Sequence, residues 1–309
     1  MHDLAEGLRA LGHQTVVVTS ARVPGRDGDV VRLPRLRSHL PAVPLALHAL
    51  RPDVAHAFQA GDAAAATLWR GPVVYTHMGI PDAADVAADR WALHAARRSD
   101  VVVVLSRHAA AAAAETFGRR PEIIHPGVAL DRFPCGGERT PEPTVVVAAA
   151  GDPRKRLDLL LEAWRLVRER RPAARLLVDR RDAPPAQPGV TAVDLDDTAR
   201  LAAITGTAWV AVLPSVNEAF GLVLVEALAT GTPVVATRDG GMPEIVDRPG
   251  IGCLFSGGAA ELARAIEAAF ALAQRPRTRA ACRARAVEFD VNRTVQAYAE
   301  VYARLARDR

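Results

Sequence analysis

Two glutamates stand eight residues apart in a segment that could bind a polar ligand. Glu218 lies in a predicted loop after a valine-rich strand, and Glu226 lies in an otherwise apolar predicted helix that opens at Gly221. A lone helical glutamate is usually solvated, but a carboxylate among apolar neighbours is costly unless it is paired or binds something. Unpaired N–H groups at a helix start attract anions, and glycine lets the backbone approach them closely. The segment therefore predicts a diphosphate site, with Glu226 placed to bind a cis-diol and Glu218 to bind sugar hydroxyls.

Three further side chains could take part in chemistry. Lys155 is the single lysine among 39 basic residues, so it marks either a position that arginine does not serve or a chance survival. His77 follows a run of valines at the end of a predicted strand. It is either structural or part of a site, and the same alternatives hold for His56.

The composition bounds the class of protein. A chain of 309 residues, half of them hydrophobic, predicts a globular protein of about two domains. The net charge of +4 comes without the clustered basic stripe of a nucleic-acid binder. It suits an anionic small ligand or an anionic membrane surface.

Cysteine usage and hydropathy favour a reduced, cytoplasmic setting. The three cysteines are far apart and form no CxxC pair, which argues against a zinc site or a disulfide framework. No signal peptide is evident at Met1, and no run approaches the roughly 18 to 20 apolar residues of a membrane span. Arg35, Arg37 and their leucine and proline neighbours form a solvated loop, a basic loop over an acceptor cleft, or a peripheral contact with the inner membrane face.

The first part of the chain alternates predicted strands and helices, which implies a parallel sheet with helical crossovers. Residues 24–44 are rich in Pro, Gly and Arg and are expected to be loop with one short strand. A doubly wound unit normally opens on a strand and a glycine-rich turn, whereas this chain opens on a helix. We therefore expect the first strand of this unit to be missing. The predicted elements are helices 3–12, 84–98 and 107–117 and strands 14–19, 54–57, 73–77, 101–105 and 123–124.

A second unit follows the linker predicted at residues 134–143, which contain three prolines and two glycines. The domains are accordingly predicted as residues 1–137 and 144–290, both Rossmann-like. The predicted strands are 144–149, 176–178, 208–213 and 233–236, and the predicted helices are 157–170, 198–205, 223–229, 259–274, 278–287 and 291–305.

The 33 residues from Pro214 to Val246 resemble the donor-site signature of the GT4 family of GT-B glycosyltransferases. Glu218 and Glu226 match the E-x7-E spacing of that family, and the segments 231–236 and 240–246 match the residues that follow it. Other matching segments extend the resemblance over nearly the whole chain. They are residues 2–19, 52–56, 101–106 and 126–133, with Pro126 where the family usually has Asn.

The resemblance implies a set of site residues. His77 matches the family histidine near the donor sugar, and with Glu218 it is the implied catalytic pair. Lys155 falls where the family lysine binds the donor diphosphate, although a solvated basic turn is the alternative. Asp152 stands where the family has arginine, so Arg154 is expected to replace it. The implied donor-binding residues are Gly151, Arg154, Lys155, Glu218, Ala219, Phe220, Gly221, Leu222 and Glu226.

The resemblance also implies a fold and a reaction. The fold is α/β of the GT-B type, with two Rossmann-like domains facing across a cleft and the last helix, 291–305, packing back on the first domain. The reaction is transfer of a hexosyl group from a nucleoside diphosphate sugar with retention of anomeric configuration. The alternatives are a GT-B sugar-nucleotide epimerase and a truncated protein that binds nucleotide sugar without turnover.

No metal site or cofactor is expected, and the implied partners are a nucleotide-sugar donor and an acceptor that is a small molecule, a glycan or a lipid. The acidic run Asp194–Asp197 contains no suitable metal motif and is expected to cap the helix that follows it. The resemblance suggests a bacterial enzyme that is cytoplasmic or peripheral at the inner membrane face.

Overall fold

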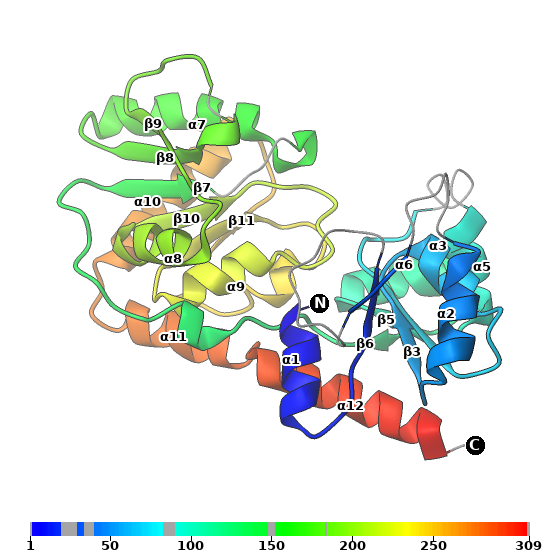
Figure 1. Cartoon of the computed structure of the whole chain (residues 1–309). Coiled ribbons are helices and arrows are strands. Elements are labelled where there is room, and N and C mark those ends of the chain that lie inside the picture. The colour runs from blue at the N-terminus through cyan, green and yellow to red at the C-terminus, as the bar shows by residue number, and fades with distance from the viewer. Residues whose placement is uncertain are drawn as a thin grey trace. The chain divides into compact units, whose positions relative to one another are not determined.

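The computed structural model describes residues 2–19, 30–33, 40–82, 90–147, 152–182 and 184–307. They form two compact α/β units, of which the first comprises Met1–His125 and Val291–Arg309 and the second Pro126–Asp290 (Figure 1).

The first unit ends at His125 rather than at the predicted residue 137. Residues 126–137 belong with the second unit because their backbone is bound by helix α11 (Thr278–Val287). The guanidinium of Arg283 on this helix donates hydrogen bonds to the carbonyl oxygens of Phe133 and Leu130, at 2.7 and 3.3 Å. The proline-rich segment 134–143 therefore lies on the second unit. It does not mark the division between the units.

The first unit contains a four-stranded parallel sheet of order β3-β4-β5-β6 and a separate parallel pair, β1-β2. Helices α3, α5 and α6 cover one face of the larger sheet, where Tyr75 packs among alanines. Helix α12 covers the opposite face with Tyr298 and Val301, and α1 packs on α12. The strands are β1 (Val17–Thr19), β2 (Val30–Arg32), β3 (Ala55–Ala57), β4 (Val73–His77), β5 (Val101–Val104) and β6 (Glu122–Ile123). The helices are α1 (His2–Ala10), α2 (Ala42–Leu50), α3 (Ala60–Ala66), α5 (Arg90–Arg98), α6 (Arg107–Phe117) and α12 (Val291–Arg307).

The sequence pattern predicts neither α2 nor α3. The prediction that the loop extends to residue 44 is wrong, because Pro44 lies in the first turn of α2. A proline is tolerated there because the N–H that it lacks would make no hydrogen bond within the helix. The strand expected at 14–19 is shorter and only partly buried. The helix expected at 84–98 is described from Arg90 onwards, and its first residues lie outside the described part of the chain.

The second unit is a six-stranded parallel sheet of order β9-β8-β7-β10-β11-β12. This is the order of a doubly wound Rossmann sheet, in which the chain direction across the sheet reverses between the first and fourth strands. Those strands are here β7 and β10. The strands are β7 (Thr144–Val147), β8 (Arg175–Asp179), β9 (Val190–Val193), β10 (Val210–Leu213), β11 (Val234–Thr237) and β12 (Gly252–Phe255).

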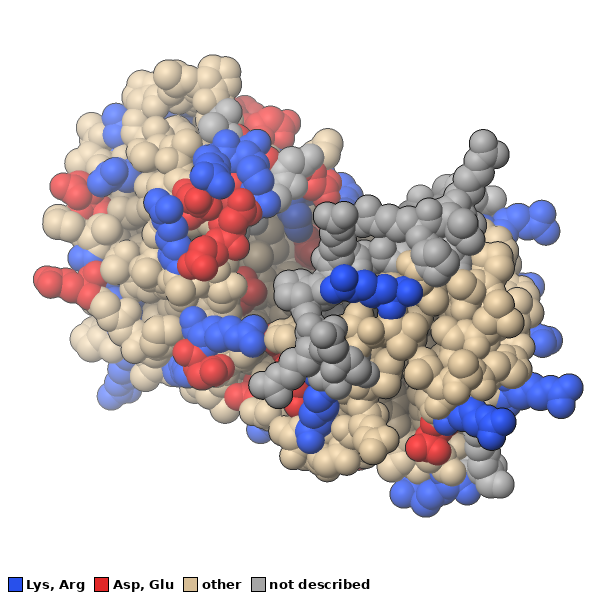
Figure 2. Space-filling view, viewed as in Figure 1, with Lys and Arg blue, Asp and Glu red and all other residues tan. Residues whose placement is uncertain are grey.

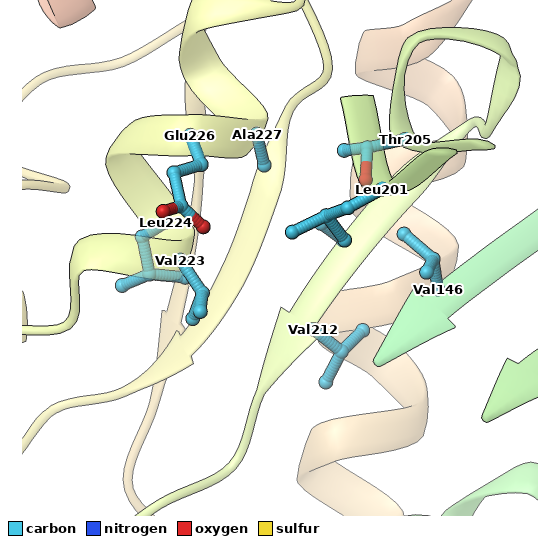
Figure 3. A pocket seen from close by; sticks show the side chains of 9 residues that line it. Val146, Leu201, Thr205, Val212, Val223, Leu224, Glu226 and Ala227 are labelled. Atoms are coloured by element: carbon cyan, nitrogen blue, oxygen red, sulfur yellow. The ribbon is translucent and has the colours of Figure 1, made fainter. Parts of the chain in front are cut away.

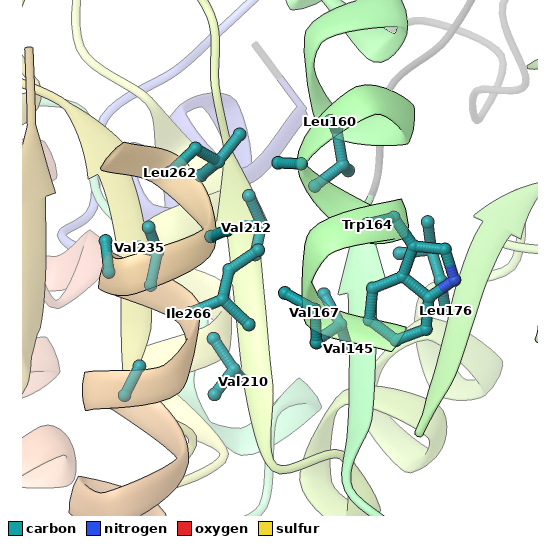
Figure 4. Close-up of a cluster of buried hydrophobic side chains, with 14 of the residues drawn as sticks. Val145, Leu160, Trp164, Val167, Leu176, Val210, Val212, Val235, Leu262 and Ile266 are labelled. Carbon is teal, nitrogen blue, oxygen red and sulfur yellow. The ribbon is translucent and has the colours of Figure 1, made fainter. Parts of the chain in front are cut away.

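Helices cover both faces of this sheet. Helices α7 and α10 cover one face, where Trp164 and Leu160 of α7 and Ile266 of α10 pack against Val145 and Val212 of the strands (Figure 4). Helices α8 and α9 lie against the other face, and α11 packs on α9. The helices are α7 (Leu157–Arg170), α8 (Thr198–Thr207), α9 (Leu222–Ala229), α10 (Ala259–Ala273) and α11.

The sequence pattern predicts α7 to the residue but not β9 and β12. Helix α7 has a strong apolar face, whereas β9 is a partly exposed edge strand and β12 begins at Gly252. The expected cap in the acidic run is confirmed, since the Asp197 carboxylate accepts a hydrogen bond from the Arg200 N–H at 2.8 Å at the start of α8.

Charge is distributed unevenly between the two units. The first contains 18 basic and 14 acidic residues, and the second contains 21 of each. On the visible face, basic side chains predominate over the first unit and are mixed with acidic ones over the second (Figure 2). Within the described ranges, no helix is both long and apolar enough to cross a membrane.

Candidate donor-binding site

The loops that follow β7 and β10 meet at the point where the strand order reverses in the six-stranded sheet of the second unit, which is the switch point of that sheet. Ligands of open α/β sheets bind in the crevice at the carboxyl ends of the strands, where the strand order reverses. Lys155 follows β7, in the short 3-10 turn η2 (Pro153–Lys155), and Glu218 follows β10. The topology therefore brings together two side chains that lie 63 residues apart in sequence.

Lys155 and Glu218 form an ion pair. The Lys155 Nζ donates a hydrogen bond to Glu218 Oε2 at 2.5 Å, and both side chains are about one-quarter exposed. The backbone reinforces this contact, since the Val216 N–H donates to the Arg154 carbonyl oxygen at 3.0 Å. The only lysine of the chain thus contacts the first glutamate of the E-x7-E pair.

Arg154 stands beside Lys155 but is directed to a different partner. Its guanidinium binds the Asp152 carboxylate at 2.7 Å, and its side chain is 63% exposed. The same contact lowers the pKa of the Asp152 carboxyl group. The expected replacement of the family arginine by Arg154 stays a prediction, as does a role for Gly151, which lies outside the described residues.

Glu226 lines a pocket between α8, α9 and the strands β7 and β10 (Figure 3). The walls are largely apolar, with Leu201, Val212 and Leu224 among the lining residues. Removal of this carboxyl group from water raises its pKa to about 7, and within the described part of the chain no charged or hydrogen-bonding group offsets that effect. A carboxylate in this state is ready to accept hydrogen bonds from a ligand that carries hydroxyl groups.

The loop between the two glutamates leads into α9. Gly221 caps this helix with a φ of 101°, a left-handed conformation that glycine adopts without steric cost. Ala219 and Phe220 are buried, and Phe220 lies 5.3 Å from the ring of Phe289. Leu222, the first helical residue, is 37% exposed. The backbone at the start of α9 is therefore held by packing on one side while Leu222 reaches the surface.

Two adjacent glycines, Gly240 and Gly241, pack against the backbone of Glu218. The Gly241 N–H donates a hydrogen bond to the Glu218 carbonyl oxygen at 2.9 Å. A Cβ atom on Gly240, whose φ is 59°, would lie 2.2 Å from that same oxygen. Backbone packs against backbone here, so only glycine fits at this position.

We expect Gly240→Ala to displace Glu218 and to destabilise the second unit by about 1–3 kcal/mol, the usual cost of a strained, crowded backbone position. Gly258→Ala is the matched control, because a Cβ there meets no atom within 4 Å and the φ is −83°. Thermal unfolding and titration with nucleoside diphosphates measure both effects. Equal melting temperatures for the two variants would contradict the close packing at Gly240.

Arg156 contributes to this site, although the sequence does not predict it as a site residue. Its Nε donates to the Pro214 carbonyl oxygen at 2.6 Å, and its Nη2 donates to Thr237 Oγ1 at 3.0 Å. Its backbone has a φ of 48°. Nothing in the residue type signals a left-handed conformation, so only the folded chain reveals this role.

His77 belongs to the first unit, at the end of β4. Its Nδ1 lies 2.8 Å from the hydroxyl of Tyr75, and its ring contacts the edge of Phe117 with centroids 5.5 Å apart. These contacts fix the orientation of the imidazole ring. The assigned role of His77 near a donor sugar stays a prediction.

His56 is structural. Its two ring nitrogens contact Tyr302 Oη at 2.5 Å and Thr76 Oγ1 at 2.7 Å, which joins β3 and β4 to α12. Burial lowers the pKa of its imidazole to about 3, so the ring is neutral at physiological pH. Of the two alternatives that the sequence leaves open, the packing of His56 supports the structural one.

Two family models match the chain. A model described as "Glycosyltransferase Family 4" matches residues 1–132, and a model described as "Glycosyl transferases group 1" matches residues 142–271. A D-inositol 3-phosphate glycosyltransferase of Mycobacteroides abscessus is 37% identical over 153 residues, which are 41% of this chain and 33% of that protein. The matched part of the chain spans a third to a half of the length of such curated relatives.

Solved structures share the fold. A glycosyltransferase of Rickettsia africae superimposes with a TM-score of 0.82 at 17% identity, covering 100% of this chain and 94% of the other. HepE of Anabaena, solved in complex with UDP-glucose, gives a TM-score of 0.79 at 21% identity, covering 97% of this chain and 94% of the other. The two family models and the paired Rossmann-like units agree, and the chain belongs to the GT4 family of glycosyltransferases, with the GT-B fold.

Proposed function

We propose that the protein transfers a hexosyl group from a nucleoside diphosphate sugar to an acceptor, with retention of anomeric configuration. The observation that carries this proposal is the meeting of Lys155 and Glu218 at the switch point of the second sheet, beside the helix that bears the partly buried Glu226. In the proposed arrangement, Lys155 and the start of α9 bind the diphosphate, Glu218 binds the hydroxyls of the sugar, and Glu226 binds the ribose.

The proposed leaving group is the nucleoside diphosphate. Lys155 would exchange its contact with Glu218 for the phosphate oxygens, and the first N–H groups of α9, at Gly221 and Leu222, would donate to the same anion. Charge that develops on the diphosphate as the glycosidic bond breaks would meet preorganised donors, which is the most effective form of electrostatic catalysis. Arg154 is a second candidate cation for this role.

The proposed ligands of the sugar and ribose are the two glutamates and His77. Release from Lys155 leaves the Glu218 carboxylate to accept hydrogen bonds from sugar hydroxyls. Glu226 accepts from the ribose diol. The acceptor hydroxyl attacks the face from which the diphosphate departs and passes its proton to the departing phosphate oxygen. The bond to the acceptor forms as the bond to the diphosphate breaks, which retains the anomeric configuration without a covalent glycosyl-enzyme.

Metal independence is part of the proposal, because Lys155 and the α9 start supply the positive charge that a divalent cation would otherwise provide. Turnover in excess EDTA should equal turnover in Mg²⁺. A loss of activity that Mg²⁺ alone restores would refute this part of the proposal.

The acceptor is proposed to be anionic. The excess of basic over acidic residues lies in the first unit, and a net positive charge attracts anionic ligands at low ionic strength. A relative that acts on D-inositol 3-phosphate suggests phosphorylated polyols as the first compounds to test. Higher turnover with a phosphorylated polyol than with its unphosphorylated parent would support this choice.

A donor screen tests the proposed function. UDP-, GDP- and dTDP-sugars are compared by thermal shift, since a ligand at 100 times its Kd stabilises the folded state by about 2.7 kcal/mol. UDP-glucose comes first because a protein of the same fold was solved with it. A glycosylated product supports transfer, an isomerised donor supports an epimerase, and binding without turnover supports a binding protein. Absence of any thermal shift would refute the assignment of the site.

A further inference from the structure

We propose that Arg156 is a positioning residue that sets the separation between Lys155 and Glu218. This inference rests on the proposed function, which assigns a nucleoside diphosphate as the ligand of the site. The polar contacts of the Arg156 side chain are with Pro214 and Thr237 and not with Lys155 or Glu218. It acts by fixing the two loops on which they stand.

The first observation is the backbone of Arg156. Its φ and ψ are 48° and 49°, so a non-glycine residue occupies the left-handed region directly after Lys155. It ends the turn η2 and precedes the first residue of α7. A conformation of this kind is strained for a residue with a Cβ atom and persists only where surrounding contacts hold it.

The second observation is the set of contacts that hold it. Through Pro214 the Arg156 side chain binds the end of β10, and through Thr237 it binds the end of β11. The guanidinium also lies 5.9 Å from the centre of the Phe255 ring, at the end of β12. One side chain therefore joins the turn after β7 to the carboxyl ends of three further strands.

The contacts of Arg156 lie close in sequence to both members of the Lys155–Glu218 ion pair. Arg156 is the next residue after Lys155, and Pro214 lies four residues before Glu218. The Val216 N–H bond to the Arg154 carbonyl completes a second link between the same loops. The 2.5 Å contact of Lys155 with Glu218 therefore depends on a register that Arg156 fixes. Lysine could not replace it, because two divergent donors in one plane require a guanidinium.

The test is a double-mutant cycle on binding of UDP, GDP and dTDP, measured by calorimetry. Arg156→Gly is the informative variant, because glycine adopts the positive φ and keeps the turn while the side-chain contacts are lost. We expect a loss of affinity of about tenfold or more. In a Lys155→Ala background, the same change should cost less than about threefold, because Arg156 acts through Lys155.

Arg51→Gly is the matched control. Arg51 also has a φ of 48°, but it caps α2 in the first unit. It should leave nucleotide affinity unchanged while relieving the same kind of backbone strain. A merely structural Arg156 would lower the melting temperature and leave affinity within twofold, or would give effects that multiply with those of Lys155→Ala. Either result overturns the proposal.

A second cycle decides the question even if no nucleotide binds. The thermodynamic coupling between Lys155→Ala and Glu218→Gln is measured by urea unfolding in the wild-type and Arg156→Gly backgrounds. Loss of that coupling in the Arg156→Gly background supports positioning by Arg156, and equal coupling in both overturns it. Failure of the wild type to bind any nucleoside diphosphate refutes the proposed function instead.

Discussion

Lys155→Ala is expected to weaken nucleoside diphosphate binding by roughly 10- to 100-fold, because a hydrogen bond to a charged group is worth about 1.5–3 kcal/mol. Two effects act in the same direction. The cation that would meet the phosphates is lost, and the Glu218 carboxylate, held at 2.5 Å from Lys155 Nζ in the free protein, faces the anionic ligand uncompensated. Calorimetric titration measures the first loss. Initial rates at saturating donor show the loss of leaving-group stabilisation.

Two companion variants separate these effects. Glu218→Gln in the Lys155→Ala background should recover part of the affinity for a nucleoside diphosphate, since it removes the uncompensated charge. Lys155→Arg should stay well below the wild type if the single lysine marks a position that arginine does not serve. Full activity of Lys155→Arg would show that the lysine is there by chance.

Glu226→Gln is expected to change stability and binding in opposite directions. Burial raises the pKa of the Glu226 carboxyl to about 7 from a usual value of 4.5. Between these pH values the unfolded chain has released the proton while the folded chain still holds it. The contribution of this group to stability therefore falls as pH rises from about 4.5 to about 7, and its penalty is fully present above that range.

Glutamine carries no such penalty. At pH 8 we expect Glu226→Gln to raise the free energy of unfolding by roughly 1–3 kcal/mol, and at pH 4.5 to leave it nearly unchanged. Nucleotide affinity at pH 8 should fall about tenfold or more, because an amide replaces the carboxylate that accepts from the ribose diol. Urea unfolding and calorimetry at both pH values give the two quantities. A stability gain of equal size at pH 4.5 would contradict the raised pKa.

The pH dependence of binding follows from the same group. The ribose hydroxyls donate to the ionised carboxylate, so wild-type affinity should rise as pH increases through about 7. Ionisation of the diphosphate itself changes over a similar range, and Glu226→Gln supplies the reference for it. The difference between the two pH profiles should contain a single transition near the Glu226 pKa.

The sequence predicts the elements that carry the candidate donor site well because their signals are local. Helix α7 follows from its apolar periodicity, and the start of α9 from Gly221. The parallel units follow from the alternation of elements. Lys155 is distinguished by composition, and the carboxylate of Glu226 by its apolar neighbours.

The rest depends on contacts between distant segments. The positive φ of Arg156 and its bonds to Pro214 and Thr237 leave no trace in residue type. The ring of His56 is surrounded by side chains of α12, about 240 residues away, and only the fold shows that it is structural. Strand β9 could not be predicted because it is short, partly exposed and without a periodic pattern. Helix α2 could not be predicted because Pro44 in its first turn is a residue more typical of loops.

Calorimetric titration of UDP, GDP and dTDP into the wild type and into Glu226→Ala at pH 8 tests the assignment of the donor site most directly. We expect at least one nucleoside diphosphate to bind the wild type. The substitution should weaken this binding tenfold or more, as expected for loss of a charged hydrogen-bonding partner worth about 1.5–3 kcal/mol. An affinity of Glu226→Ala within twofold of the wild type would contradict the placement of the donor site.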